Sequence, residues 1–225
     1  MKKILIQLDT DPHASSFDRV VAIDAGVDEL MSYSDVTPVN VESLVHGAMF
    51  TRGPKELKNT ALFVGGSEVH SGETLFHKIQ DTFFGPMRVS VMMDSNGSNT
   101  TAAAAVLAAG KHLDFSDTTA LVLGGTGPVG QRAAQLLAKR GAKVILASRS
   151  ADRAQAACEA IAQIVENADL TPLALKDHKQ IEAANKSTSL IISAGAAGVK
   201  LLPSACWKPM KQLKVVIDLN AVPPA

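Results

Sequence analysis

Residues 121–130 read Leu-Val-Leu-Gly-Gly-Thr-Gly-Pro-Val-Gly, and within this stretch Gly125, Gly127 and Gly130 satisfy the pattern GxGxxG. The apolar run before the glycines predicts a strand, and the amphipathic pattern over residues 129–140 predicts a helix. A second strand is predicted to begin shortly after that helix. The stretch therefore predicts a βαβ unit, the context in which a GxGxxG match indicates a dinucleotide-binding loop. The alternative is a glycine-rich turn that holds no ligand.

Each glycine of this loop has an expected role. Gly125 would permit the tight turn, Gly127 would let the backbone approach a diphosphate, and Gly130 would let the helix pack closely on the strand. The unpaired amides of the first helical turn would meet the phosphate charge. The residues expected to hold the diphosphate are Gly125, Thr126, Gly127, Pro128, Val129 and Gly130.

The residues after the second strand, Ala147-Ser148-Arg149-Ser150, indicate which dinucleotide is bound. A site selective for NAD usually carries an acidic residue there for the ribose 2′-hydroxyl. Here Arg149 can pair with a 2′-phosphate, Ser148 and Ser150 can donate hydrogen bonds, and Arg153 follows one turn later. The stretch favours NADP as the cofactor. The alternative is that both arginines are solvated surface charges.

Three further strands are predicted in the second half of the chain, over residues 172–175, 190–193 and 215–219. Ligands of parallel sheets collect beyond the carboxyl ends of the strands. Ala194 and Gly195 follow one of these strands and Asn220 follows another, so we expect all three to flank the ribose and the nicotinamide. The alternative for Gly195 is a simple turn.

Short apolar runs and helical patterns also alternate in the first half. The runs that predict strands cover residues 3–8, 29–33, 61–64 and 88–93. Residues 17–25 fit a helix and a strand equally well by their period. Repeated units of this kind predict a parallel sheet with helices packed on it, because a parallel connection needs a dozen or more residues. We expect an α/β fold of two domains, an N-terminal parallel α/β substrate domain over 1–105 and a Rossmann-type NADP-binding domain over 106–225.

The composition excludes several classes of protein. Of 225 residues, 46% are apolar and 20% are charged, which rules out a disordered or collagen-like chain. Lysine plus arginine (22) equals aspartate plus glutamate (22), so the basic excess of a nucleic-acid-binding protein is missing. Cys158 and Cys206 form no CxxC pair, and no stretch is apolar enough for a membrane span. We expect a cytoplasmic protein with a small-molecule substrate and without metal, nucleic-acid or membrane partners.

The sequence offers no evident proton-transfer group. The single tyrosine, Tyr33, has no lysine three or four residues later, and the six histidines show no metal-ligand spacing. This pattern favours a hydride transfer that needs no catalytic acid or base, so no residue is assigned to that role.

Several segments form a distinctive set along the chain. The most specific are Asp-Ser-Asn-Gly-Ser-Asn-Thr-Thr over residues 94–101 and the loop 125–130. The other segments cover residues 7–11, 17–18, 33–38, 50–53, 63–66, 83–86 and 218–224. This set resembles the NADP-dependent methylene-tetrahydromethanopterin/methylene-tetrahydrofolate dehydrogenases of bacterial one-carbon metabolism.

The resemblance implies a reaction that moves hydride from the methylene group of methylene-tetrahydromethanopterin or methylene-tetrahydrofolate to NADP and leaves a methenyl cation. No proton leaves in that step, so positioning and electrostatics can suffice. Asp9, Asp11 and Asp94, all at expected strand ends, are candidates to stabilise the positive charge. Loop capping and turn formation are the alternative for these three residues.

The resemblance also assigns Phe17, Asn99 and Thr101 to the substrate site. Phe17 would supply a flat apolar surface for the pterin rings, and Asn99 and Thr101 would hydrogen-bond the pterin or the nicotinamide in a cleft between the domains. Judged without the family, an isolated phenylalanine is more often a core residue, and Asn99 and Thr101 are helix caps.

The family also raises two expectations about the whole protein. Its members form homo-oligomers. They also continue past the Asn-x-x-Pro-Pro segment, whereas this sequence stops at Ala225. Because of this difference, one alternative function is a nonenzymatic NADP-binding sensor or truncated homologue without turnover. Another is a bifunctional dehydrogenase and cyclohydrolase, against which the missing Tyr-x-x-x-Lys argues.

Overall fold

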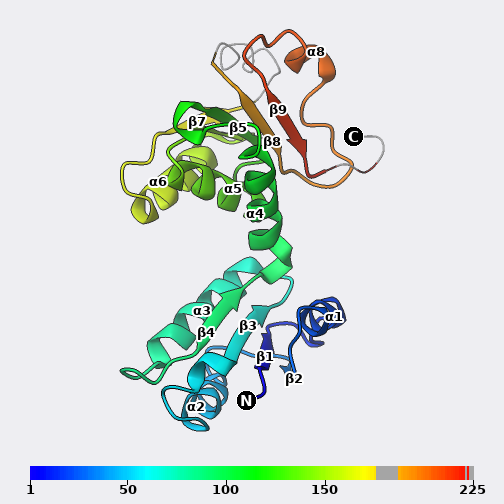
Figure 1. The fold of residues 1–225 in the computed structure, drawn as a ribbon. Helices are drawn as coiled ribbons and strands as arrows, with labels where there is room; N and C mark the ends of the chain where they lie inside the picture. Colours follow the sequence, from blue (N-terminus) through cyan, green and yellow to red (C-terminus); the bar gives the residue numbers. More distant parts are fainter. Residues whose placement is uncertain (176–186, 221, 223–225) are drawn as a thin grey trace. The chain divides into compact units, whose positions relative to one another are not determined.

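The chain forms two compact units, Met1–Asn99 and Thr100–Ala225, in a computed structural model that describes residues 1–175, 187–220 and 222 (Figure 1). Each unit contains its own parallel sheet. The predicted domain boundary at 105/106 falls inside helix α4 (Ser98–Ala109). In the described part of the chain, no helix is long and apolar enough to span a membrane.

The first unit is a four-stranded parallel sheet in the order β2-β1-β3-β4. Its strands are β1 (Ile4–Asp9), β2 (Glu29–Tyr33), β3 (Thr60–Gly65) and β4 (Ser90–Met93). Its helices are α1 (Ser16–Asp24), α2 (Glu42–Phe50) and α3 (Val69–Thr82), with short 3-10 turns η1 (Leu57–Asn59) and η2 (Ser95–Gly97). Helices α2 and α3 pack together on one face of the sheet, and α1 lies on the other side, as Figure 1 shows.

The core of the first unit lies between the sheet and helices α2 and α3. Leu8 and Leu62 of the strands are fully buried there, together with Met49 of α2 and Leu75 of α3. The segment whose period was ambiguous forms helix α1. This helix differs from α2 and α3, because Ala22 is its only buried residue. Its larger apolar side chains remain exposed: Phe17 by 76%, Val20 by 57%, Val21 by 50% and Ile23 by 59%.

The second unit is a five-stranded parallel sheet in the order β7-β6-β5-β8-β9. Its strands are β5 (Thr119–Leu123), β6 (Lys143–Ser148), β7 (Leu170–Ala174), β8 (Leu190–Ser193) and β9 (Val215–Asp218). Its helices are α4, α5 (Pro128–Lys139), α6 (Ala151–Ile164) and α8 (Ser204–Trp207), with the 3-10 turn η3 (Phe115–Asp117). The predicted α/β fold with a Rossmann-type second domain is therefore confirmed.

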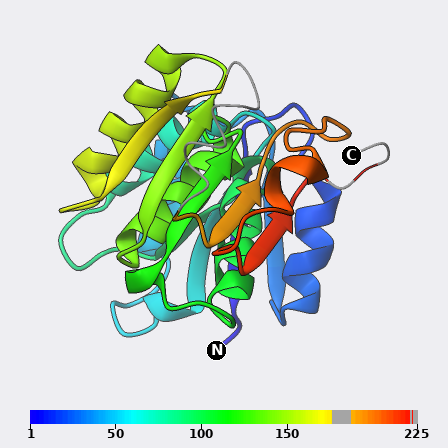
Figure 2. The ribbon, with the colours of Figure 1, turned by 90° about the horizontal axis from the view of Figure 1, so that it is seen from above.

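Alternating side chains of the second sheet build two separate cores. Val122 and Leu146 point into a core formed with helices α4, α5 and α6. Leu121 and Leu123, one residue out of phase, point into a core on the other face, where Trp207 of α8 packs. Figure 2 shows α6 and α8 on opposite sides of this sheet.

The strand order of the second unit fixes where a ligand can bind. The chain passes from β5 outward through β6 to β7, and then returns to β8 on the other side of β5. The connections after β5 and β8 therefore leave the sheet in opposite directions, and open α/β sheets bind their ligands beyond the carboxyl ends of the strands at such a point. Loop 124–127 lies at this topological switch point.

Candidate functional site

The left-handed residue of the glycine loop is a glycine that the motif does not include. Gly124 has a left-handed backbone with φ +68°, and a Cβ there would lie 2.8 Å from Ala194 O. Gly125, to which the sequence assigned the tight turn, does not have positive φ. A Cβ on Gly125 would instead meet Leu146 Cγ at 2.6 Å, so Gly125 is needed for packing against β6. Gly125 is a central residue of the tight turn that Gly127 N closes on Gly124 O, as expected, but the positive φ of this turn is at Gly124.

Gly130 and Gly127 are glycines for different reasons. A Cβ on Gly130 would lie 2.4 Å from Gly124 O, so helix α5 can approach the loop only without a side chain there, as predicted. Gly127 has an ordinary extended backbone with φ −80° and ψ 165°. A Cβ on Gly127 would make normal contacts, 3.4 Å from Gly124 O and 3.8 Å from Ala194 O. Nothing in the folding of the described chain requires a glycine at position 127.

The start of helix α5 leaves donors for a ligand. Pro128 is the first helical residue and has no N–H, while Gly127 N donates to Gly124 O at 3.0 Å. Among the described residues, no acceptor bonds the backbone N–H groups of Val129 and Gly130. These two amides lie at the positive end of the helix dipole, where an anion is stabilised. The missing side chain at Gly127 and the two spare amides fit a dinucleotide diphosphate.

The end of strand β6 carries the residues predicted to select the cofactor. Ser148 is half-buried, and its Oγ lies 3.4 Å from Thr126 Oγ1 and accepts from Ser150 N at 3.4 Å. Ser150 Oγ caps helix α6 by accepting from Arg153 N. Arg149 and Arg153 are exposed, and neither forms an ion pair with another described residue. In the described part of the chain, neither guanidinium group therefore has an acidic partner.

The ends of β8 and β9 bring the remaining predicted cofactor residues together. Ala194 N donates to Leu123 O at 2.9 Å, directly before the glycine loop. Asn220 is 1% exposed, and its Nδ2 donates to Ser193 Oγ at 2.8 Å. A Cβ on Gly195 would lie 2.6 Å from Leu201 Cδ1, so this glycine makes room for Leu201 of its own chain.

Four aspartates gather at the carboxyl edge of the first sheet. Asp9 is 1% exposed, and its carboxylate accepts from Asp11 N at 3.0 Å and from Ser15 N at 2.9 Å. Asp11 accepts from both the backbone N and the Oγ of Ser67, each at 3.0 Å. Asp9 thus organises the loop that leads into α1, and Asp11 ties that loop to the end of β3.

Asp18 is the member of this group that sequence reasoning missed as a functional candidate. Burial, and after it the charges of Asp9 and Asp94, raise the pKa of Asp18, while hydrogen bonding to Ser15 opposes the shift. The carboxylates of Asp9 and Asp18 both lie near Gly65, at the end of β3. The signal in the sequence was the pair Phe17-Asp18 at the start of a segment whose period was ambiguous.

The start of helix α4 uses its polar residues locally. Asp94 Oδ1 accepts from Asn99 N at 2.8 Å, and Asn99 Nδ2 donates to Met93 O at 2.6 Å. Thr101 is half-buried one turn into the helix. Phe17, by contrast, is on the exposed side of α1. The residue type alone favours a place in the core, and the structure does not put Phe17 there.

The raised pKa of Asp18 has a consequence for stability. A folded-state pKa above the unfolded value means that the fold disfavours the charged form, so stability is lost as the pH rises through the folded pKa. We expect Asp18→Asn to raise the thermal midpoint at neutral pH and to leave it unchanged well below 3.8, the ordinary pKa of the group. A variant that is equally stable or less stable than the parent at neutral pH would contradict this reading.

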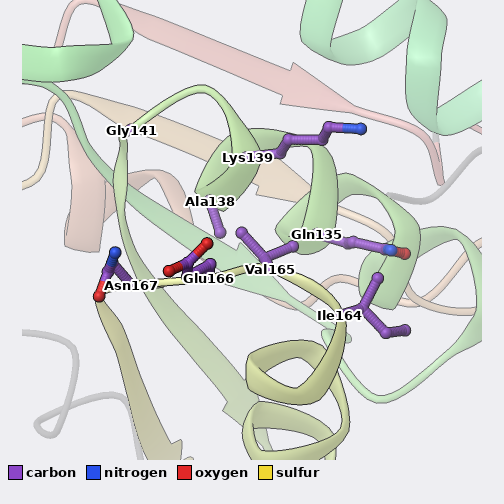
Figure 3. A pocket seen from close by; sticks show the side chains of 8 residues that line it. All are labelled: Gln135, Ala138, Lys139, Gly141, Ile164, Val165, Glu166 and Asn167. Carbon is purple, nitrogen blue, oxygen red and sulfur yellow. The ribbon is translucent and has the colours of Figure 1, made fainter.

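A pocket of about 420 Å³ lies at the other end of the second sheet (Figure 3). The C-terminal ends of α5 and α6 form it, and Lys139, Ile164, Glu166 and Asn167 are among its lining residues. The carbonyl ends of helices repel phosphate, and none of the predicted site residues lines this pocket. A search of the described residues finds no cluster of histidine, cysteine or carboxylate side chains suited to a metal ion.

Comparison with protein families divides the chain in the same way as the structure. Residues 16–96 match the family model described as methylene-tetrahydromethanopterin dehydrogenase, N-terminal. Residues 118–216 match the family model described as short chain dehydrogenase.

Two relatives come from Methylorubrum extorquens. A protein named bifunctional protein MdtA is 45% identical over 225 residues, which cover 99% of this chain and 78% of that protein. A protein named NAD(P)-dependent methylenetetrahydromethanopterin dehydrogenase is 30% identical over 230 residues, which cover 100% of this chain and 77% of that protein.

Solved structures share the fold at low sequence identity. Shikimate 5-dehydrogenase from Listeria monocytogenes is 17% identical with a TM-score of 0.63, and the match covers 96% of this chain and 78% of that one. The 5-ketofructose reductase of a Gluconobacter species is 16% identical with a TM-score of 0.58, over 97% and 79% of the two chains. These similarities extend over both α/β units.

Proposed function

The chain belongs to the family of methylenetetrahydromethanopterin dehydrogenases, and from this premise we propose that it oxidises methylene-tetrahydromethanopterin or methylene-tetrahydrofolate to the methenyl form with NADP. Membership makes the protein an oxidoreductase. The choice of NADP and the choice of pterin are the parts that this proposal adds.

The observation that carries the proposal is the loop between β5 and α5. Gly127 has a backbone that any residue can adopt and space that a methyl group could fill, yet the position is glycine. A requirement for close backbone approach by a diphosphate explains that choice. The spare amides of Val129 and Gly130 would bind the diphosphate, with Thr126 and Pro128 shaping the loop.

The end of β6 supports NADP over NAD. Arg149 and Arg153 are exposed and lack an acidic partner among the described residues, and no carboxylate stands at the end of β6 to accept a ribose hydroxyl. A guanidinium group can form two parallel hydrogen bonds with a phosphate. Ser148 and Ser150 would add hydroxyl donors to the same phosphate.

We expect Arg149→Ala to weaken NADP binding by about tenfold to a hundredfold, since a hydrogen bond to a charged group contributes about 1.5–3 kcal/mol. The affinity for NAD should not change. Calorimetric titration of both cofactors measures the effect, and Lys143→Ala, at the other end of the same strand, serves as the control. Equal losses for NAD and NADP would show that Arg149 does not read the 2′-phosphate.

The first unit would supply the pterin site. Phe17 offers an exposed aromatic face on α1, and Asp9, Asp11, Asp18 and Asp94 concentrate negative charge at the carboxyl edge of the sheet. Hydrogen bonds from Ser15, Ser67 and Asn99 orient three of these carboxylates, those of Asp9, Asp11 and Asp94. Asn99 and Thr101 would add polar contacts near the start of α4.

The proposed chemistry needs little from the protein beyond binding and charge. When bound, the nicotinamide ring of NADP accepts hydride from the methylene carbon of the substrate. The methenyl product is a cation spread over two nitrogen atoms, and carboxylates already in place stabilise such a charge without rearranging. The residues therefore act by orienting and by electrostatics, and none has to move a proton.

A spectrophotometric assay tests this function directly. The appearance of NADPH with methylene-tetrahydromethanopterin or methylene-tetrahydrofolate is the expected result, and comparison of the two substrates decides between the pterins. Tight binding of NADP without turnover of either substrate would overturn the proposed reaction and support the nonenzymatic alternative.

A further inference from the structure

The side chain of Asn220 is buried with one hydrogen-bonding atom unused. Its Nδ2 donates to Ser193 Oγ at 2.8 Å, its backbone N–H donates to Asp218 Oδ1 at 2.8 Å, and its carbonyl accepts from Gly198 N at 3.2 Å. Within the described part of the chain, no donor reaches Asn220 Oδ1. A buried acceptor without a donor is unusual in a folded protein, so a partner from outside the chain is the natural explanation.

The sheet places this acceptor beside the glycine loop. Ser193 is in register with Leu123, the last residue before the loop, and on its other side with Asp218. Along the carboxyl edge of the sheet, the strand order β6, β5, β8, β9 gives three neighbouring places for the parts of a dinucleotide. Residues that fit a 2′-phosphate end β6, residues that fit a diphosphate follow β5, and Asn220 lies where the rest of the dinucleotide must extend, beyond β8 and β9.

The segment that lies against Asn220 is small. Residues 194–198 read Ala-Gly-Ala-Ala-Gly, and a Cβ on Gly195 would be 3.4 Å from Asn220 Nδ2. Side chains of this size leave little to displace when a ligand reaches the asparagine. The bond to Ser193 engages the nitrogen of the amide, so the oxygen is the atom left for that ligand.

We propose that Asn220 Oδ1 accepts a hydrogen bond from the carboxamide N–H group of nicotinamide, and that Ser193 holds the amide in the orientation this requires. The inference rests on the proposed use of NADP. It names Asn220 as the residue that reads the carboxamide and so fixes how the nicotinamide ring is turned. Ser193 is a positioning residue that acts through Asn220.

Three ligands and the intact chain test this assignment by calorimetric binding. NADP carries the carboxamide, the acetylpyridine analogue of NADP has a methyl group in place of the amino group, and 2′-phospho-ADP-ribose lacks the ring altogether. We expect the wild-type chain to bind NADP about tenfold more tightly than the analogue, the size of one well-made hydrogen bond. Asn220→Ala should remove this preference and leave the affinity for 2′-phospho-ADP-ribose unchanged. Asn220→Asp, which keeps acceptor oxygens, should retain the preference.

The outcomes separate this inference from the function on which it rests. Equal affinity of the wild-type chain for NADP and its analogue would overturn the role of Asn220, even if the variants failed to fold. Equal losses for all three ligands in Asn220→Ala would also overturn it, because a ribose contact or a general structural role would then explain the residue. A wild-type chain that bound neither NADP nor 2′-phospho-ADP-ribose would refute the proposed cofactor itself.

Discussion

Gly127→Ala is expected to fold normally and to lose most of its affinity for NADP. The backbone at this position suits any residue, and the added methyl group would make only ordinary contacts with Gly124 O and Ala194 O. If the diphosphate approaches the backbone here, the same methyl group stands in its way. Steric overpacking typically costs about 1–3 kcal/mol, so the dissociation constant should rise by about fivefold to a hundredfold. Thermal unfolding and calorimetric titration together measure both halves of the prediction.

Gly130→Ala is the matched comparison on the same loop. Its Cβ would lie 2.4 Å from Gly124 O and 2.8 Å from Gly125 Cα, so the backbone itself must shift and the folded state should be destabilised by about 1–3 kcal/mol or more. Loss of binding in Gly130→Ala would thus accompany loss of stability. Unimpaired NADP binding by Gly127→Ala would remove the main support for a diphosphate at this loop.

Asp9→Ala is expected to destabilise the first unit without any ligand present. The buried carboxylate accepts from Asp11 N and Ser15 N, and its removal leaves two amides without their acceptor. The two amides are only partly buried, so water can replace part of what each loses, and a loss of about 1–3 kcal/mol follows. Hydrogen exchange at residues 10–16 measures this loss of stability locally. Global unfolding of a chain with two units would not assign the loss to the first unit.

Asp11→Ala provides the comparison for Asp9. Its carboxylate bonds the exposed residue Ser67, so its removal should change stability by less than about 1 kcal/mol, because water can replace the lost contacts. If Asp9→Ala were as stable as Asp11→Ala, the buried carboxylate would have no structural role, and direct contact with the substrate would be the better account of its presence.

Much of the second unit could be predicted because its signals are local. The apolar run, the glycines and the helix that follow one another over residues 121–140 specify a βαβ unit by pattern alone. The turn at Gly124 could not be assigned in the same way. Both Gly124 and Gly125 permit unusual backbone angles, and only the folded chain, in which Gly124 lies against Ala194 and Gly125 against Leu146, shows which of the two has positive φ.

The first unit shows what a pattern of apolar residues cannot decide. The spacing over residues 17–25 did not distinguish helix from strand, and it gave no warning that Phe17, Val20 and Ile23 would be largely exposed. Asp18 was overlooked for a related reason. Its pKa is raised by burial and by the charges of Asp9 and Asp94, which follow two different strands. These residues come close to Asp18 only in the folded sheet, so the sequence pattern does not reveal the contact.

The hydroxyl contact between Thr126 and Ser148 connects the two segments proposed to bind the diphosphate and the 2′-phosphate. Thr126 belongs to the loop after β5, and Ser148 ends the neighbouring strand, one residue before Arg149. Under the proposed use of NADP, replacing residues 148–150 to favour NAD would also remove the hydroxyl group that contacts Thr126. Coenzyme exchange in this scaffold therefore calls for paired redesign of both segments rather than a single swap.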